Sequence, residues 1–341
     1  MKKKLFWWGF LFTALAFGYV AWQVFGPTLS APESNYFYIR SGSTYKEVTQ
    51  SLIDKKIIHN PFFFNLLSQQ LKYPEKIKPG RYQIKKGSSI FSLLRMLRSG
   101  NQTPVNLVIN KLRLKEDLAQ KIAANFECDS ASVMAVLTNQ NTLLAYAVNS
   151  HTVMTTVIPN TYRIFWNTSA EKIIDKLYNE KEKFWNADRR LKAKAMNLTP
   201  EQVYTMASIV EEETNKEEDK GLIASVYMNR MAIGMKLQAD PTVKFALKNF
   251  TLTRILHGHL SFASPFNTYQ NTGLPPGPIC TPSIKTIDAV LQAPQTNYIY
   301  FVAKPDFNGY SNFATTYAEH LVFAKAYQNA LDDLMKAKAV K

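Results

Sequence analysis

The sequence has few of the residues that build metal or thiol sites. Its 341 residues include two cysteines, Cys128 and Cys280, and five histidines. The cysteines lack metal-ligand spacing and fit either a disulfide outside the cytoplasm or two buried thiols. His257 and His259 have no acidic partner in an HExxH-like frame. The sequence therefore predicts neither a metal centre nor a cofactor.

Acidic residues are scarce as well. There are 26 of them against 41 basic residues, which gives a formal net charge of +15. Such an excess favours an anionic neighbour, namely nucleic acid, membrane head groups or an acidic wall polymer, although it also suits a merely soluble surface. Zinc-finger spacing, an RNP-like aromatic box and a basic repeat are all absent from the sequence, so we expect no nucleic-acid partner.

Charge is also missing from a long stretch near the N-terminus. Lys2, Lys3 and Lys4 precede 21 uncharged residues, Leu5 to Phe25. As a helix these would span roughly 30 Å, the thickness of a bilayer core. The sequence therefore predicts a cytoplasmic tip and transmembrane anchor over residues 1–27, with the lysines inside and the rest of the chain outside. A cleaved signal peptide is the alternative.

The body of the chain predicts an α+β fold with a small module at 36–102 and a larger mixed α/β domain at 103–341. Strands are expected at 36–39, 81–86, 105–109 and 296–306. Helices are expected at 45–53, 61–71, 88–99, 114–126, 130–137, 170–196, 200–213, 222–231 and 317–337. Residues 264–282 contain five prolines and two glycines, which predicts an ordered loop.

One predicted helix carries the residues that best suggest chemistry. In VYTMASIVEEETN, Val203, Met206, Ala207 and Val210 form an apolar stripe on a helical wheel. Glu211 and Glu213 fall about 80° to either side of it, and Glu212 points into solvent. A carboxyl group beside apolar surface tends to stay protonated and can act as a general acid. Two solvated glutamates at a helix end are the plainer interpretation.

Polar residues downstream could complete a cleft. Asp240-Pro241 favours a turn that presents Gln238, and Asn267-Thr268-Tyr269 offers the amide, hydroxyl and phenol groups that hold sugars. Taken alone, each segment is better explained as an ordinary surface turn. Together with a protonated glutamate they indicate an enzyme that cuts an acid-sensitive bond, with a glycosidic bond as the leading case.

Six segments carry a family resemblance, in the order ASIVEEET, NR, LQADPTV, NTY, GLPPGPI and FATTYAEH. Together they resemble the endolytic murein transglycosylase (YceG-like) family from Tyr36 to near the C-terminus. The module at 36–102 resembles the LysM-like subdomain of that family, which implies glycan binding. Asn160 and Phe266 depart from the family pattern, where Asp and Tyr are usual.

The resemblance implies a lytic transglycosylase. Such enzymes cut the bond between N-acetylmuramic acid and N-acetylglucosamine inside a peptidoglycan strand and leave a 1,6-anhydro end. The catalytic glutamate would be Glu211, with Glu213 as second choice. The residues that position substrate would be Gln238, Asp240, Asn267, Thr268 and Tyr269. The implied setting is the outer (periplasmic) side of the cytoplasmic membrane, with glycan strands and wall synthases (penicillin-binding proteins) as partners.

Two other functions fit the same residues. One is a non-catalytic, membrane-anchored scaffold that binds peptidoglycan and recruits wall synthases. The other is a murein hydrolase that uses water, which needs a second carboxylate opposite the acid. Asp240 is the candidate for that second group.

Overall fold

A computed structural model describes residues 2–339, and the chain divides into two compact units. Unit 1 comprises Met1–Leu107, Ala123–Asp129 and Tyr162–Ser169. Unit 2 comprises Val108–Ile122, Ser130–Thr161 and Ala170–Lys341. Both contain helices and short two-stranded sheets, so the fold mixes α and β structure as predicted.

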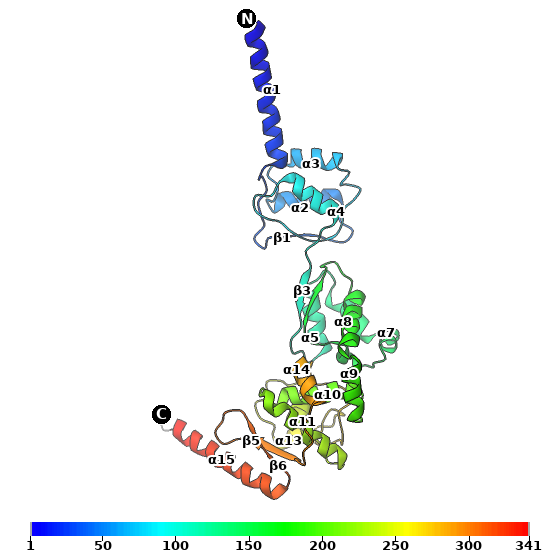
Figure 1. The fold of residues 1–341 in the computed structure, drawn as a ribbon, viewed down its shortest axis with the longest axis vertical. Helices are drawn as coiled ribbons and strands as arrows, with labels where there is room; N and C mark the ends of the chain where they lie inside the picture. The colour runs from blue at the N-terminus through cyan, green and yellow to red at the C-terminus, as the bar shows by residue number, and fades with distance from the viewer. Residues whose placement is uncertain (1, 340–341) are drawn as a thin grey trace. The chain divides into compact units, whose positions relative to one another are not determined.

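Unit 1 contains an N-terminal helix and a small α/β core (Figure 1). Its elements are α1 (Lys2–Phe25), β1 (Tyr36–Ile39), α2 (Tyr45–Asp54), α3 (Pro61–Gln70), β2 (Gly80–Gln83) and α4 (Ile90–Ser99). β1 pairs antiparallel with β2 and sets Phe37 opposite Tyr82, and both rings are fully buried. Gly100 ends α4 in the left-handed conformation, with φ of 73°. The helix thus ends at Ser99, as the predicted range 88–99 has it.

Helix α1 is long and apolar enough to cross a membrane. The candidate span is Phe6–Phe25, and only 6% of its most apolar window is buried against protein. A core helix of that composition would be covered on most sides. The composition and length of α1 therefore agree with the predicted anchor.

Unit 2 holds most of the helices. They are α5 (Lys115–Ala123), α6 (Ser130–Thr138), α7 (Gln140–Ala145), α8 (Ala170–Phe184), α9 (Ala187–Ala195), α10 (Pro200–Glu213), α11 (Glu217–Ala232), α12 (Asp240–Ala246), α13 (His257–Leu260), α14 (Ile284–Leu291) and α15 (Tyr317–Ala339), with a 3₁₀ turn η1 (Val153–Thr156). In this unit β5 (Tyr300–Ala303) pairs with β6 (Ser311–Ala314), whereas most of the pair formed by β3 (Val105–Val108) and β4 (Thr161–Ile164) belongs to unit 1.

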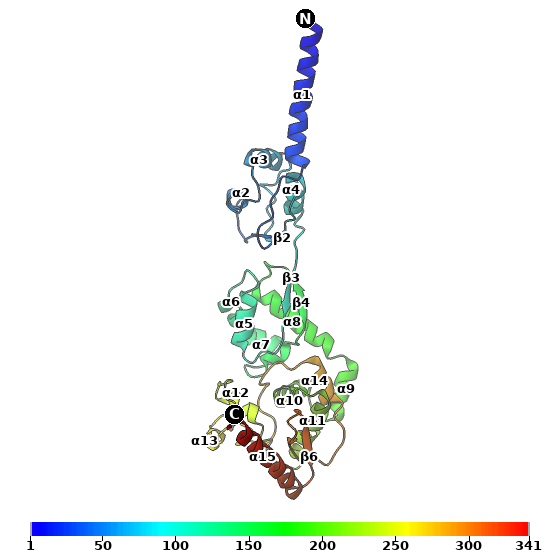
Figure 2. The same cartoon turned by 90° about the vertical axis from the view of Figure 1, so that its left-hand side faces the viewer.

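Helix α10 lies at the centre of unit 2, beside α11 and α14 (Figures 1 and 2). Thr199 and Gln202 form a capping box, and Pro200 occupies the first helical position, where the predicted helix 200–213 begins. Every residue from Val203 to Val210 is buried. The middle of the helix therefore has no solvent face, and its last three residues, Glu211 to Glu213, are partly exposed.

Two expectations about helices were wrong. The expected helix 170–196 is two helices, because Asn186 caps α9 by accepting a hydrogen bond from the amide of Arg189. Trp185, at the break, is 2% exposed and anchors the bend in the core. Helix α11 starts at Glu217, five residues before the predicted start. The prediction for 264–282 is confirmed, because that segment forms neither helix nor strand.

Candidate functional site

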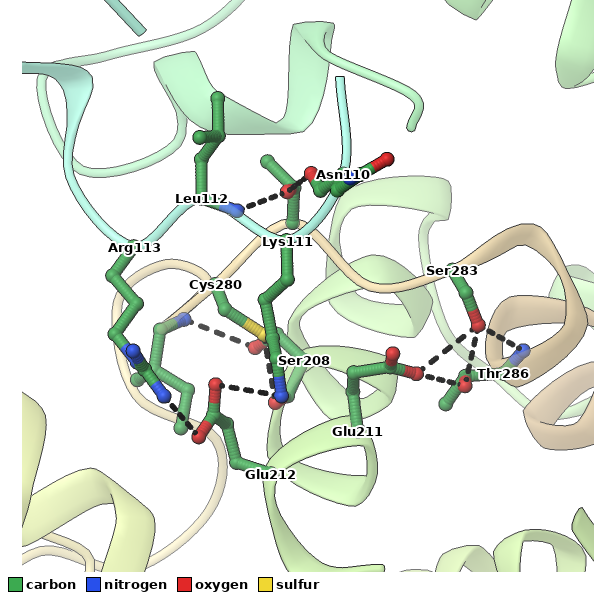
Figure 3. A network of polar contacts seen from close by, with 12 residues as sticks. Asn110, Lys111, Leu112, Arg113, Ser208, Glu211, Glu212, Cys280, Ser283 and Thr286 are labelled. Atoms are coloured by element: carbon green, nitrogen blue, oxygen red, sulfur yellow. Dashed lines mark hydrogen bonds and ion pairs between the residues drawn. The ribbon is translucent and has the colours of Figure 1, made fainter. Parts of the chain in front are cut away.

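The last turn of α10 sends three glutamates into three different surroundings. Glu211 faces α14 and its preceding loop (Figure 3). Its Oε2 accepts hydrogen bonds from the hydroxyls of Ser283, at 3.1 Å, and Thr286. The Nζ of Lys220 lies 3.6 Å from the same oxygen. Two hydroxyl donors and one ammonium group therefore surround this oxygen.

Glu211 also lines a pocket of about 340 Å³. The pocket wall includes Asn110, Lys111, Asn160 and Ser283. Its lining mixes polar with apolar residues, and its volume is large enough for a sugar ring with its substituents.

Glu212 does not point into solvent, and the prediction from the helical wheel was wrong on this point. Its side chain is 15% exposed and forms ion pairs with Lys111, at 3.3 Å, and Arg113, at 2.9 Å (Figure 3). The wheel assumed one buried stripe. The segment around Leu112 covers the other side of α10, held there by hydrogen bonds between Leu112 and Thr281.

Glu213 faces α11, and its surroundings desolvate its carboxyl group. The phenol of Tyr227, on α11, donates a hydrogen bond to its Oε1 at 2.7 Å. Desolvation raises the pKa of Glu213 to about 7, the Tyr227 hydrogen bond opposes this rise, and the charge of Asp240 adds to it. The charges of Arg230 and Lys244 lower the pKa by smaller amounts. A carboxyl group with this pKa is half protonated at neutral pH.

Two of the predicted polar residues meet near Glu213. The phenol of Tyr269 donates a hydrogen bond to Oδ1 of Asp240 at 2.6 Å. Burial, helped by this bond to Asp240, raises the pKa of Tyr269, so its phenol remains a donor. The charge of Glu213 contributes to the same rise. Asp240, Tyr269 and Glu213 therefore form one electrostatically coupled group.

The other predicted polar residues shape the loops around this group. Asn267 is fully buried, and its Nδ2 donates to the carbonyls of Leu260 and Phe262 at 3.0 and 2.8 Å. Thr268 is buried too, and its Oγ1 accepts from the amide of Ala239 at 3.0 Å. Both side chains therefore hold the backbone of neighbouring loop segments in place.

Gln238, by contrast, has an exposed side chain and a positive φ of 51°. Its amide donates to the carbonyl of Thr268 at 3.1 Å, which holds this strained turn in place. Among the five predicted polar residues, Gln238 and Asp240 are therefore the ones whose side chains are open to solvent.

Sequence reasoning missed two residues of the site. Tyr227 carried no signal, and Arg230 entered only as part of the NR segment. Arg230 is buried, and it donates to the carbonyls of Ile299 and Leu237 at 2.7 and 2.5 Å. Tyr227 and Arg230 are three residues apart, which puts them on one face of α11. Apart from the NR segment, nothing in the sequence indicated this pair, because its place beside Glu213 depends on how α11 packs against α10.

The described residues 2–339 contain no cluster of three or more His, Cys, Asp or Glu side chains that could hold a metal ion. Cys280 is buried and Cys128 is partly exposed, and they do not form a disulfide with each other.

Comparison with known proteins identifies the family. Residues 37–326 match the family described as YceG-like. The chain belongs to the YceG-like family. The prediction from the six segments is thereby confirmed. All residues of the three glutamate surroundings lie within the matched range.

Relatives and a solved structure agree with this membership. The chain is 38% identical over 154 residues to the endolytic murein transglycosylase of Bacillus subtilis, an alignment that covers 45% of this chain and 42% of that protein. It is 27% identical over 295 residues to the endolytic murein transglycosylase of Streptococcus pneumoniae, covering 78% of this chain and 53% of the relative. The chain thus spans about half the length of these relatives.

The solved structure is a crystal structure of a YceG-like protein from Listeria monocytogenes. It matches with a TM-score of 0.57 at 27% identity, covering 84% of this chain and 98% of that one. The fold of the YceG-like family is therefore present across most of the chain.

Proposed function

We propose that this chain is an endolytic lytic transglycosylase that cuts peptidoglycan glycan strands between N-acetylmuramic acid and N-acetylglucosamine, with Glu213 as its general acid and base. The names of the two relatives support the substrate and the reaction. One observation carries the mechanism, namely a carboxyl group with a pKa of about 7 inside the family-matched range.

The surroundings of the glutamates favour Glu213 over Glu211, which the resemblance placed first. A general acid must hold a proton in the resting enzyme. The carboxyl group of Glu211 is already engaged by two hydroxyl hydrogen bonds and lies beside the Lys220 ammonium. Glu213 has one hydrogen-bond donor and is otherwise desolvated. We therefore assign Glu211 to substrate contact in its pocket.

The proposed reaction needs one carboxyl group. Glu213 donates its proton to the bridging oxygen as the bond from that oxygen to C1 of the muramic acid breaks. The C6 hydroxyl of the same sugar then forms the new bond to C1 and returns its proton to Glu213. Glu213 ends protonated as it began, and water takes no part. Asp240, with Tyr269, would stabilise the positive charge that develops at C1.

Product analysis tests the reaction. Purified glycan strands are digested with the full chain in detergent, and the new ends are identified by mass spectrometry. The expected product carries a 1,6-anhydro end, lighter by one water molecule than a hydrolysed end. Hydrolysed ends would instead favour the water-using hydrolase with Asp240 as second carboxylate. Binding to sacculi without new ends would favour the scaffold.

We propose further that α1 anchors the chain in the cytoplasmic membrane, with unit 2 on the outer side where peptidoglycan lies. The length and composition of α1 and the lysines before it support this orientation. Wall synthases (penicillin-binding proteins) that make the same strands are the expected partners.

The LysM-like character of residues 36–102 belongs to the same proposal. A cavity of about 740 Å³ in unit 1 lies beside Tyr38 and Trp166. The ring centroids of these two residues are 5.0 Å apart. Aromatic rings with polar neighbours, here Arg40 and Ser41, suit a glycan ligand.

Replacing Tyr227 with Phe should move the pH profile. The hydrogen bond from Tyr227 stabilises the ionised form of Glu213, so its loss raises the Glu213 pKa further. The alkaline limb of kcat/KM, which falls above about pH 7 in the wild type, should move to higher pH. A loss of about 1 kcal/mol raises the pKa by roughly 0.7, so we expect the ratio of activity at about pH 8 to that at about pH 6 to rise roughly three- to fourfold. A uniform loss at all pH values would indicate a purely structural role.

A further inference from the structure

Helix α3 exposes apolar side chains that no part of unit 1 covers. Phe62 is 64% exposed and Leu66, one turn later, is 49% exposed. The opposite face of the same helix packs inward, with Phe63 and Phe64 buried. The helix PFFFNLLSQQ contains no charged residue. The N-terminal half of its outer face is therefore apolar, and its C-terminal half is polar and uncharged.

This helix lies beside the end of the candidate membrane span. The rings of Tyr19 on α1 and Phe63 on α3 have centroids 6.0 Å apart. Both ribbon views show α3 next to the last turns of α1 (Figures 1 and 2). Tyr19 lies six residues before the end of α1, which is about 9 Å along a helix. A bilayer that holds α1 up to Phe25 would therefore reach the level of α3.

Helix α4 also lies beside the end of the candidate membrane span. Phe91, in its first turn, lies against Phe25, with ring centroids 5.2 Å apart. The chain leaves α1 through a short connection in which the amide of Leu29 donates to the carbonyl of Ser88. These contacts join α1 to the core of unit 1 at the end of the span. The tilt of α1 and the placement of α3 are thus coupled.

The charges around α3 suit anionic lipid head groups. Exposed lysines flank the helix on both sides, Lys55 and Lys56 before it and Lys72 after it. Residues 36–102 contain twelve basic and three acidic residues. Basic side chains near a bilayer surface gain about 1 kcal/mol each from anionic lipids.

We propose that α3 is an interfacial helix that inserts Phe62 and Leu66 into the head-group region of an anionic bilayer. The flanking lysines contact the phosphates, and the polar end of the helix faces water. This contact fixes the height and tilt of unit 1 at the membrane surface. The inference rests on the proposal that α1 is a membrane anchor.

Photo-crosslinking in a bilayer tests the inference with the full chain and its native cysteines. The photoreactive residue p-benzoylphenylalanine replaces Phe62 in protein reconstituted into nanodiscs of phosphatidylglycerol and phosphatidylethanolamine. Leu15 on α1 serves as the positive reference and Leu144 on unit 2 as the exposed apolar control, since they are 65% and 66% exposed. Adducts are identified by mass. We expect lipid adducts at positions 62 and 15, at least tenfold above position 144.

The outcomes separate this inference from the rest of the function. Lipid adducts at position 15 with none at 62 would overturn it and leave the anchor intact. Adducts from position 62 to a second copy of the chain would also overturn it. An absence of lipid adducts at both positions would remove the anchor and this inference together, while strand cleavage in detergent would be unaffected. Because Leu66 lies on the same face, the same replacement there should repeat the result without altering Phe62.

Discussion

Replacing Glu213 with Gln should abolish cleavage of glycan strands, lowering kcat/KM by about 10²- to 10⁴-fold. Glutamine keeps the size of the side chain and can still accept the Tyr227 hydrogen bond. It has no proton to give to the bridging oxygen and cannot accept one from the C6 hydroxyl. The rate is measured as new anhydro ends formed on purified strands, and binding to sacculi is measured in parallel. Binding should stay within about twofold of the wild type.

The neighbouring glutamates supply matched controls on the same helical turn. Glu212→Gln removes a charge that is ion-paired with Lys111 and Arg113 and should leave the rate within about tenfold. Glu211→Gln should weaken substrate binding and raise KM more than it lowers kcat. If Glu211→Gln abolishes cleavage while Glu213→Gln remains active, the assignment of the acid to Glu213 is wrong. If all three variants cleave normally, none of these glutamates is the general acid and the proposed mechanism fails.

Local signals in the sequence predicted helix ends well. Thr199, Pro200 and Gln202 specify the start of α10 through their own side chains, and Gly100 ends α4 through a backbone conformation that favours glycine. These interactions involve residues within four positions of each other. Nothing elsewhere in the chain is needed to form them.

Long-range packing explains what the sequence could not predict. The helical wheel placed Glu212 in solvent because it counted apolar residues on α10 alone. The cover on that side comes from Lys111 and Arg113, which are about a hundred positions earlier. The break before α9 likewise depends on Trp185 entering the core, a fact that periodicity in a charged helix does not reveal.

The candidate site, too, has features that local sequence predicted and features that depend on long-range packing. The residues were found by type, since carboxyl, amide and phenol groups near a turn are recognisable in sequence. Their grouping was not predicted, because Asp240 and Tyr269 are 29 positions apart and meet through a loop without regular structure. The choice between Glu211 and Glu213 depends on Tyr227, Ser283 and Lys220, and therefore on how α11 and α14 pack against α10.

The raised pKa of Glu213 also lowers the stability of the folded protein at alkaline pH, and we expect this effect to be large. An ordinary glutamate has a pKa of 4.5, whereas burial raises that of Glu213 to about 7. Between these pH values the unfolded chain releases the proton and the folded chain keeps it. The folded state therefore loses stability as pH rises through this window, and the loss levels off above about pH 7. A shift of this size corresponds to about 3 kcal/mol.

Glu213→Gln should therefore be more stable than the wild type at alkaline pH, although it is inactive. Glutamine does not titrate, so the gain should approach about 3 kcal/mol near pH 8 and vanish near pH 4.5. The measurement is the melting temperature of both proteins in one detergent across this range, where we expect a difference of several degrees at the alkaline end. Glu212→Gln, which breaks an ion pair, should show no such gain. A constant offset between Glu213→Gln and wild type at every pH would mean that Glu213 ionises as an ordinary carboxyl group, and it would remove the physical basis for choosing it as the acid.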